Sequence, residues 1–182
     1  MQVIEGNIDE IATMHPRLYL EHHIVMAVAL LQQISASPCD LQVTCDGVSF
    51  STIRDSKFVL RVHWQQAVED AADRVLYSEQ RNPIVERAAI AVAALLLGKT
   101  MPQLQMFVAT PGDRVDFLLP EIEHAVEISG TDSKDALTAR ARRKKKQVQS
   151  NNHRWPGHAI VCCFDRTQPE IHWSQVNYGA KS

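Results

Sequence analysis

Two acidic residues in the second half of the chain, Asp116 and Glu127, lie among apolar residues, where a carboxylate requires a compensating positive charge. Asp116 lies in the stretch RVDFLLP and Glu127 in the stretch HAVEISG, and both stretches favour strands. Alternation along a strand leaves each carboxylate between large apolar neighbours, which is unfavourable unless its charge is compensated. If the two strands pair, the carboxylates converge, and a divalent cation such as Mg²⁺ would offset their repulsion. Each residue alone has a simpler interpretation: it faces solvent or pairs with an arginine such as Arg114.

The elements that must position this pair follow one another closely from residue 83 onward. PIVERAAIAVAALLLGK predicts a helix that is buried on most sides, because it is apolar on nearly every face. Three strands are expected next, in LQMFVAT, RVDFLLP and HAVEISG, and their short links imply antiparallel neighbours. A helix over about 133–150 then crosses to a buried strand in HAIVCCF, which implies parallel pairing, and IHWSQV offers a last strand.

The first 80 residues predict a helix within 17–34, an antiparallel hairpin over 41–62 with its turn at Asp46-Gly47, and a helix over about 64–80. The fold class is therefore α/β: a mixed central sheet with a helix-strand-strand-strand-helix-strand core, plus an N-terminal helix and β-hairpin extension. We expect residues 1–80 to be this extension and 81–182 to be the core, in one compact unit.

The order of elements and the places of the two carboxylates resemble the PD-(D/E)XK nuclease superfamily, which has the restriction-endonuclease-like fold. The resemblance covers about residues 83–165, with Asp116 on the second core strand and Glu127 on the third. It implies that Asp116, Glu127 and the backbone carbonyl of Ile128 bind Mg²⁺ or Mn²⁺. Glu86 matches the position of an additional acidic ligand in many members, although a first-turn Glu also stabilises a helix through its dipole.

The chain departs from this family at Ser129, where the usual residue is a lysine that activates the attacking water and stabilises charge on the phosphate. Some members supply this lysine from the following helix. At 100° per residue, Lys134 and Lys144 fall on the inner face of that helix, with Arg140 at its edge. We expect Lys134 to be the catalytic lysine, because it is nearest to Glu127 in the sequence; a side chain that extends into solvent is the alternative.

The same helix carries the basic run RRKKK, from Arg142 to Lys146, whose charges should lie mostly on its outer and lateral faces. Such residues could contact phosphates, or could simply form a solvated charged face. The candidate nucleic-acid contacts are Arg140, Arg143, Lys144, Lys145 and Lys146. A metal site at Glu21, His22 and His23 is not expected, because adjacent helical positions point about 100° apart.

Composition limits the remaining choices. A net charge of −2 argues against coating nucleic acid through overall charge, but not against a local basic surface. The four cysteines lack a metal-ligand spacing and suit reduced, buried thiols. The sequence shows no signal peptide and no apolar run of bilayer length, so we expect a cytoplasmic protein without membrane contact.

Three functions are consistent with these observations. The first is a metal-dependent nuclease that hydrolyses DNA, or alternatively RNA, and releases a 3′-hydroxyl and a 5′-phosphate, as the resemblance implies. The second is a catalytically inactive protein of the same fold that binds nucleic acid or another protein, with Ser129 marking the loss of chemistry. The third is an α/β interaction protein whose N-terminal extension forms a homodimer or binds a partner protein.

Overall fold

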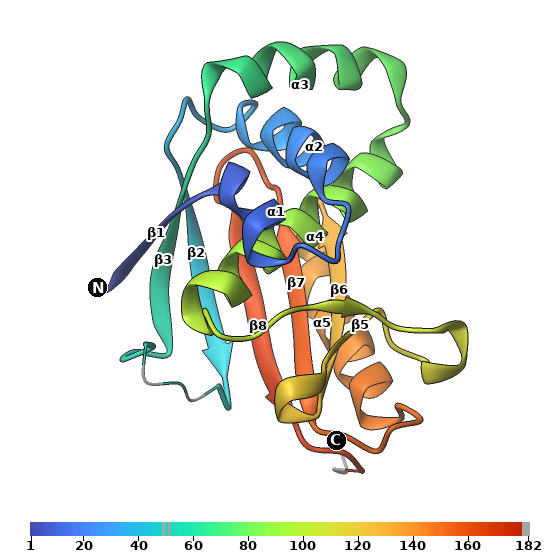
Figure 1. The fold of residues 1–182 in the computed structure, drawn as a ribbon. Coiled ribbons are helices and arrows are strands. Elements are labelled where there is room, and N and C mark those ends of the chain that lie inside the picture. Colours follow the sequence, from blue (N-terminus) through green and yellow to red (C-terminus); the bar gives the residue numbers. More distant parts are fainter. Residues whose placement is uncertain (49, 51, 180–182) are drawn as a thin grey trace.

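The computed structural model describes residues 1–48, 50 and 52–179, which form one α/β unit around a single mixed sheet (Figure 1). The eight strands are β1 (Val3–Asn7), β2 (Cys39–Asp46), β3 (Lys57–His63), β4 (Phe107–Val108), β5 (Phe117–Leu119), β6 (His124–Thr131), β7 (Gly157–Cys163) and β8 (Glu170–Val176). The α-helices of this part of the chain are α1 (Ile11–Met14), α2 (Glu21–Leu31), α3 (Gln66–Ser78), α4 (Arg81–Thr100) and α5 (Lys134–Gln149). The strands are ordered β1-β3-β2-β8-β7-β6-β5-β4 across the sheet.

The second half of the chain has the order of elements that the sequence predicts. Strands β4, β5 and β6 form an antiparallel series, α5 follows β6, and β7 returns parallel to β6. The last strand, β8, pairs antiparallel with β7. The first strand of the series is much shorter than expected, because only Phe107 and Val108 pair with β5.

The first half of the chain continues the same sheet instead of forming an appendage. Its hairpin, β2 and β3, is antiparallel as predicted, and β2 pairs in parallel with β8. A short strand that the sequence did not indicate, β1, pairs in parallel with β3 and forms the edge of the sheet. Long-range pairing therefore joins β1, β2 and β3 to the C-terminal strands.

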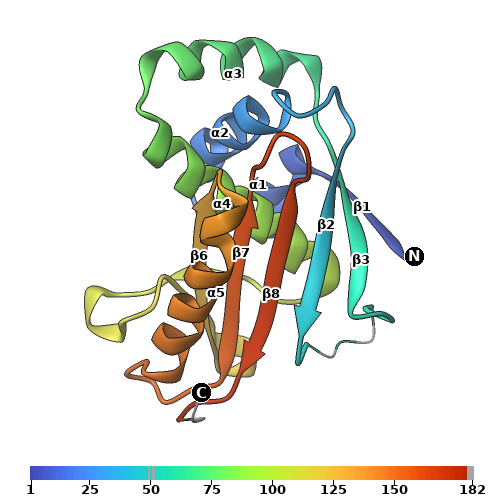
Figure 2. The ribbon, with the colours of Figure 1, turned by 180° about the vertical axis from the view of Figure 1, so that it is seen from behind.

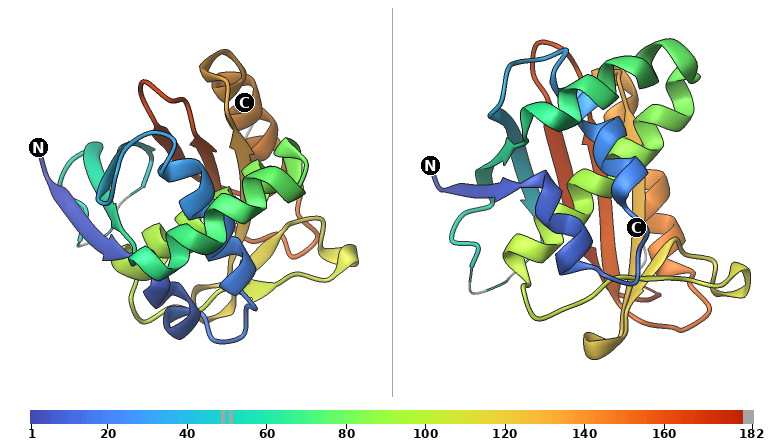
Figure 3. Two further views of the ribbon diagram at one scale, coloured as in Figure 1. Left: turned by 90° about the horizontal axis from the view of Figure 1, so that it is seen from above. Right: turned by 45° about the horizontal axis from the view of Figure 1, so that its top comes forward.

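Helices cover the two faces of the sheet differently, so the fold has layers (Figures 2 and 3). The apolar helix α4 packs on one face and is itself covered by α1 and α2, so that its residues from Ala91 to Gly98 are all buried. The amphipathic helix α5 packs alone on the opposite face, where Leu137 and Val148 contact apolar residues of β7 and β8. The prediction of an α4 that is buried on most sides is confirmed.

Gly130 lets α4 approach β6 closely. A Cβ atom at this position would lie 2.2 Å from the carbonyl oxygen of Val85, which is shorter than any tolerable contact. The backbones of β6 and the first turns of α4 therefore touch at Gly130, and Glu86 follows directly after the contact.

Candidate active site at the edge of strand β6

The candidate site lies where β5 stops pairing with β6. The β5 pairing ends at Phe117 opposite Val126, so the next β6 amides on that side would have no strand partner. Two carboxylates bind them: the Ile128 amide donates to Asp116 Oδ2 at 2.9 Å, and the Gly130 amide donates to Glu86 Oε2 at 2.9 Å. The sheet edge thus fixes both acidic side chains beside β6.

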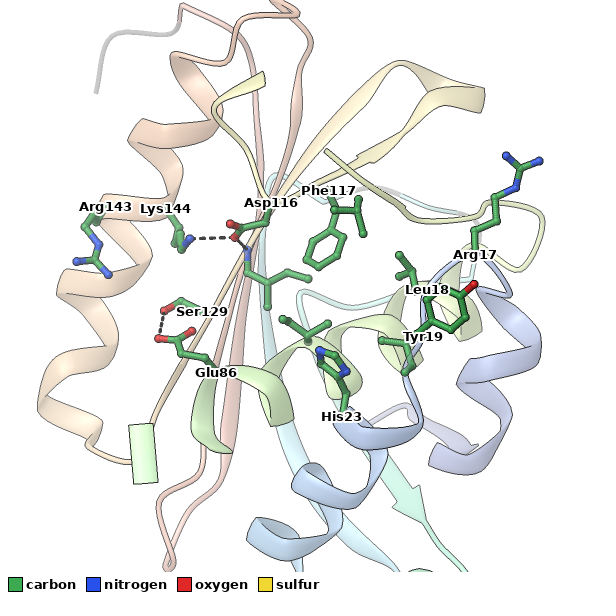
Figure 4. A pocket seen from close by; sticks show the side chains of 14 residues that line it. Arg17, Leu18, Tyr19, His23, Glu86, Asp116, Phe117, Ser129, Arg143 and Lys144 are labelled. Atoms are coloured by element: carbon green, nitrogen blue, oxygen red, sulfur yellow. Dashed lines mark hydrogen bonds and ion pairs between the residues drawn. The ribbon is translucent and has the colours of Figure 1, made fainter. Parts of the chain in front are cut away.

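Glu127 and Asp116 meet at one lysine of α5, and that lysine is Lys144. Its Nζ lies 2.5 Å from Glu127 Oε2. The same Nζ lies 3.0 Å from Asp116 Oδ2 (Figure 4). The two carboxylate oxygens are therefore no more than 5.5 Å apart, the sum of these two distances. The convergence of Asp116 and Glu127 that the sequence predicts is confirmed.

Differences in burial affect the protonation of Glu127 and Lys144. The Glu127 side chain is 1% exposed and that of Lys144 is 10% exposed, whereas Asp116 is 40% exposed and reaches solvent. Burial is the largest cause that raises the pKa of Glu127; the hydrogen bond from Lys144 opposes it, the negative charge of Asp116 adds to it, and the net pKa is about 7. Burial alone would lower the pKa of Lys144, but Asp116 and Glu127 outweigh this and raise it. Lys144 therefore remains an ammonium ion.

A second polar cluster, of Ser129, Glu86 and Arg140, lies two residues further along β6 than Glu127. Arg140 Nη1 lies 2.8 Å from Glu86 Oε1 and 3.1 Å from Ser129 Oγ, and the Ser129 hydroxyl donates to the same Glu86 oxygen at 3.3 Å. Glu86 thus has hydrogen-bond donors from Gly130, Ser129 and Arg140. Through these contacts Glu86 orients Arg140 and binds the free amide at the edge of β6. Its role as a metal ligand stays a prediction.

The expectation that Lys134 lies beside Asp116 and Glu127 is wrong. Its Nζ lies 2.6 Å from Gln168 Oε1 and 3.9 Å from Glu170 Oε1, and its side chain is 51% exposed. Helix α5 begins at Lys134 and runs back along β6, so its first turn stays at the end of the strand, beyond Glu127. Lys144 lies beside the two carboxylates instead. The sequence placed it on the inner face of the helix but assigned it to nucleic-acid contact.

The other members of the basic run lie mainly outside, as predicted. Arg142, Arg143 and Lys146 are exposed, and Lys145 forms an ion pair of 2.5 Å with Asp46 on β2. Arg143 differs from the rest because it lines the same pocket as Lys144. Of the run, Arg143 and Lys144 are therefore the two that face the candidate site.

Two pockets flank Asp116. The first has a volume of about 600 Å³ and extends from Asp116, Lys144 and Arg143 to the loop before α2, where Arg17 and Tyr19 line it (Figure 4). The second, of about 550 Å³, lies on the Glu127 side and is lined by Arg114, among others. A ligand in either pocket would reach the Asp116 carboxylate.

The donor chemistry of the site fits a hard divalent cation. Mg²⁺ takes carboxylate oxygens near octahedral geometry, keeps several waters, and typically uses only one or two protein carboxylates together with substrate phosphate. The described residues contain no cluster of three or more His, Cys, Asp or Glu side chains suited to a metal, but the Asp116–Glu127 pair meets this smaller requirement.

Comparison of the chain with protein-family models, with curated proteins and with solved structures gave no match. Within the described residues, no helix combines the length and apolarity required to cross a membrane. All four cysteines are reduced and buried, in agreement with the prediction of structural thiols.

Proposed function

We propose that the chain is a metal-dependent nuclease of the PD-(D/E)XK type, acting on DNA or alternatively on RNA, with Lys144 in the role of the lysine that Ser129 replaces. The observation that carries this proposal is the convergence of Asp116, Glu127 and the Lys144 ammonium at one point of the β6 edge. The order of core elements, from α4 to β7, agrees with the resemblance.

Each residue has a defined task in this proposal. Asp116 and Glu127 would hold Mg²⁺ or Mn²⁺, which when bound supplies Lewis-acid stabilisation of the phosphate and a more acidic water. Lys144 provides a fixed positive charge for the non-bridging phosphate oxygen and for the water that attacks phosphorus. Arg140 and Arg143 bind flanking phosphates. Water adds to phosphorus, the P–O3′ bond breaks, and the 3′-oxygen takes a proton, which leaves a 3′-hydroxyl and a 5′-phosphate.

The competing function is a catalytically inactive binding module. The observation that favours it is the same ammonium group: Lys144 already compensates both carboxylates, so it could serve as a permanent substitute for the metal. The two functions differ in whether Lys144 is needed for chemistry or only for folding.

The test is cleavage of labelled DNA and RNA, single-stranded and duplex, in Mg²⁺ or Mn²⁺. Replacing Lys144 with Met should slow cleavage by about 100-fold or more, the scale of losing one electrostatic contact in a transition state. Lys134→Met is the matched control on the same helix and should retain activity within about 2-fold, because its Nζ contacts Gln168.

A second variant keeps the test decisive if Lys144→Met fails to fold. Asp116→Asn changes a partly exposed carboxylate and should abolish cleavage while the circular dichroism spectrum stays unchanged. Full activity in Lys144→Met would contradict the role of the lysine. Wild-type protein that cleaves none of these substrates would contradict the nuclease proposal and favour the binding module.

A further inference from the structure

The pocket beside Asp116 is completed by the N-terminal loop between α1 and α2, outside the segment that resembles nucleases. Tyr19 is 90% exposed and Val108 is 67% exposed, and both of these large apolar side chains line this pocket. Single exposed apolar residues need no explanation, but two on the rim of one cavity next to charged groups indicate a binding surface.

This loop is held in place by a buried histidine. His15 is 1% exposed, and its Nε2 lies 3.0 Å from the carbonyl oxygen of Ala94 on α4. Its Nδ1 accepts a hydrogen bond from the Met106 amide at 3.2 Å, so Nε2 carries the proton and donates. The segment that follows His15 is therefore fixed to both α4 and the chain leading into β4. Tyr19 projects from an anchored segment.

Positive charge lies at both ends of the pocket. The guanidinium carbon of Arg17 lies 4.8 Å from the centroid of the Phe107 ring, which fixes it against β4 by a cation–π contact. Arg143 and Lys144 stand at the opposite end, beside Asp116. Between them the wall is apolar, with Leu18 and Phe117 both more than nine-tenths buried. The acidic groups at the far end are already paired, Glu86 with Arg140 and Asp116 with Lys144.

An apolar slot with an exposed aromatic ring and flanking cations matches the chemistry of a nucleotide. A base offers a flat face for stacking on tyrosine, and its phosphates are anionic. In an intact duplex the bases are stacked and paired, so none could enter such a slot without being extruded. An unpaired nucleotide can enter it directly.

We propose that this pocket holds the base of an unpaired nucleotide adjacent to the scissile phosphate, stacked on Tyr19, so that the preferred substrate is a single strand or an unpaired end. The proposal rests on the proposed nuclease function for the identity of the neighbouring phosphate. The base contact itself requires no cleavage, so it can be tested separately.

The experiment measures binding without metal. A fluorescent single-stranded DNA of about 12 nucleotides, its RNA counterpart and a blunt duplex of the same sequence are titrated with protein in EDTA, using fluorescence anisotropy. Wild-type protein should bind a single strand more tightly than the duplex. Tyr19→Ala should weaken that binding by about 10-fold, and Tyr19→Phe should keep it within about 2-fold, since stacking needs only the ring.

Controls separate stacking from charge. Tyr77→Ala removes an equally exposed ring, at 93%, from α3, where it lines no part of this pocket, and should not change binding. Tyr19→Ala should leave the slope of log K against log salt unchanged, whereas Arg17→Gln should reduce it by about one unit, as the loss of one phosphate contact would. A difference between the DNA and RNA affinities of the wild type that is lost in Tyr19→Ala shows which sugar the pocket prefers.

The outcomes distinguish this inference from the proposed function. Equal affinity of wild type and Tyr19→Ala for the single strands, or tighter binding of the duplex, overturns the inference even if the protein cleaves DNA. Tyr19-dependent binding of a single strand supports it, and if the wild type then cleaves nothing with Mg²⁺ or Mn²⁺, only the nuclease proposal fails. An absence of binding to all three probes overturns the inference.

Discussion

The ammonium nitrogen of Lys144 lies 2.5 Å from Glu127 Oε2, inside the layer between α5 and β6. Both side chains are at least nine-tenths buried, and Lys144 is the main compensation for the charge of Glu127, whereas Asp116 and Glu127 together compensate Lys144. Asp116 joins them from the sheet edge, where it is open to solvent. The same three groups thus account for local stability and for the proposed chemistry.

Removing the cation from this pair should destabilise the fold. Lys144→Met leaves Glu127 buried without its partner, and we expect the free energy of unfolding to fall by about 3 kcal/mol in chemical denaturation. Lys145→Met is the control: its ion pair with Asp46 is more exposed, so its loss should cost less than about 1 kcal/mol.

The double variant Lys144→Met/Glu127→Gln should recover more than half of this loss, because the isolated charge is gone. A double variant as unstable as Lys144→Met would show that the lysine stem, and not the ion pair, provides the stability.

The sequence predicted the carboxylate pair but selected a lysine that does not reach it, and the reason is geometric. Glu127 lies four residues before the end of β6, which is roughly 13 Å along a strand. Helix α5 returns along β6, and at about 1.5 Å per residue it needs roughly nine residues to cover that distance. This arithmetic leads from Lys134 to the neighbourhood of Lys144. Proximity in the sequence was therefore the wrong criterion, although the helical face was correct.

Other parts of the fold depend on contacts that no local pattern contains. The element order after residue 83 follows from periodicity and short links, and it is confirmed. The parallel pairing of β2 with β8 joins residues more than 100 positions apart, and β1 has too few residues for alternation to be visible. For the same reason the sequence did not indicate that Arg17 and Tyr19 line the pocket of Asp116.

Stability should fall in acid because of a buried histidine on β7. His158 is fully buried, with its Nε2 2.9 Å from His124 Nδ1 and its Nδ1 accepting from Trp173 Nε1 at 3.2 Å. Burial, with a smaller contribution from His124, lowers the pKa of His158 from 6.5 to about 3. Between these values the unfolded chain binds the proton and the folded chain does not, so stability present above pH 6.5 is lost as the pH falls.

We expect His158 to contribute a loss of about 1–2 kcal/mol in the free energy of unfolding between pH 6.5 and 5, because the slope rises toward about 1.4 kcal/mol per pH unit below the unfolded pKa. Urea denaturation at several pH values measures it. His158→Gln should show a correspondingly smaller loss over this range, and an identical pH profile in the two proteins would refute the assignment.

The close approach of α4 to β6 predicts a sharp difference between two glycines. Gly130→Ala would place its Cβ 2.2 Å from the Val85 carbonyl oxygen, so we expect about 2–3 kcal/mol of destabilisation and displacement of Glu86 from the Gly130 amide. Gly112→Ala meets nothing within 4 Å and should change stability by less than about 0.5 kcal/mol. Equal thermal midpoints for the two variants would show that the contact is readily relieved.

The most direct test of the central claim, that Asp116 and Glu127 form a divalent-cation site, is a calorimetric titration with Mn²⁺. Wild-type protein should bind one ion with a Kd below about 1 mM, and Asp116→Asn should weaken this by about 10-fold or more. Asp132→Asn is the matched control and should stay within about 2-fold, because the Asp132 carboxylate lies beyond the end of β6 and pairs with Arg81 at 3.1 Å. No binding by the wild type at millimolar Mn²⁺, or equal affinity in wild type and Asp116→Asn, would contradict the account.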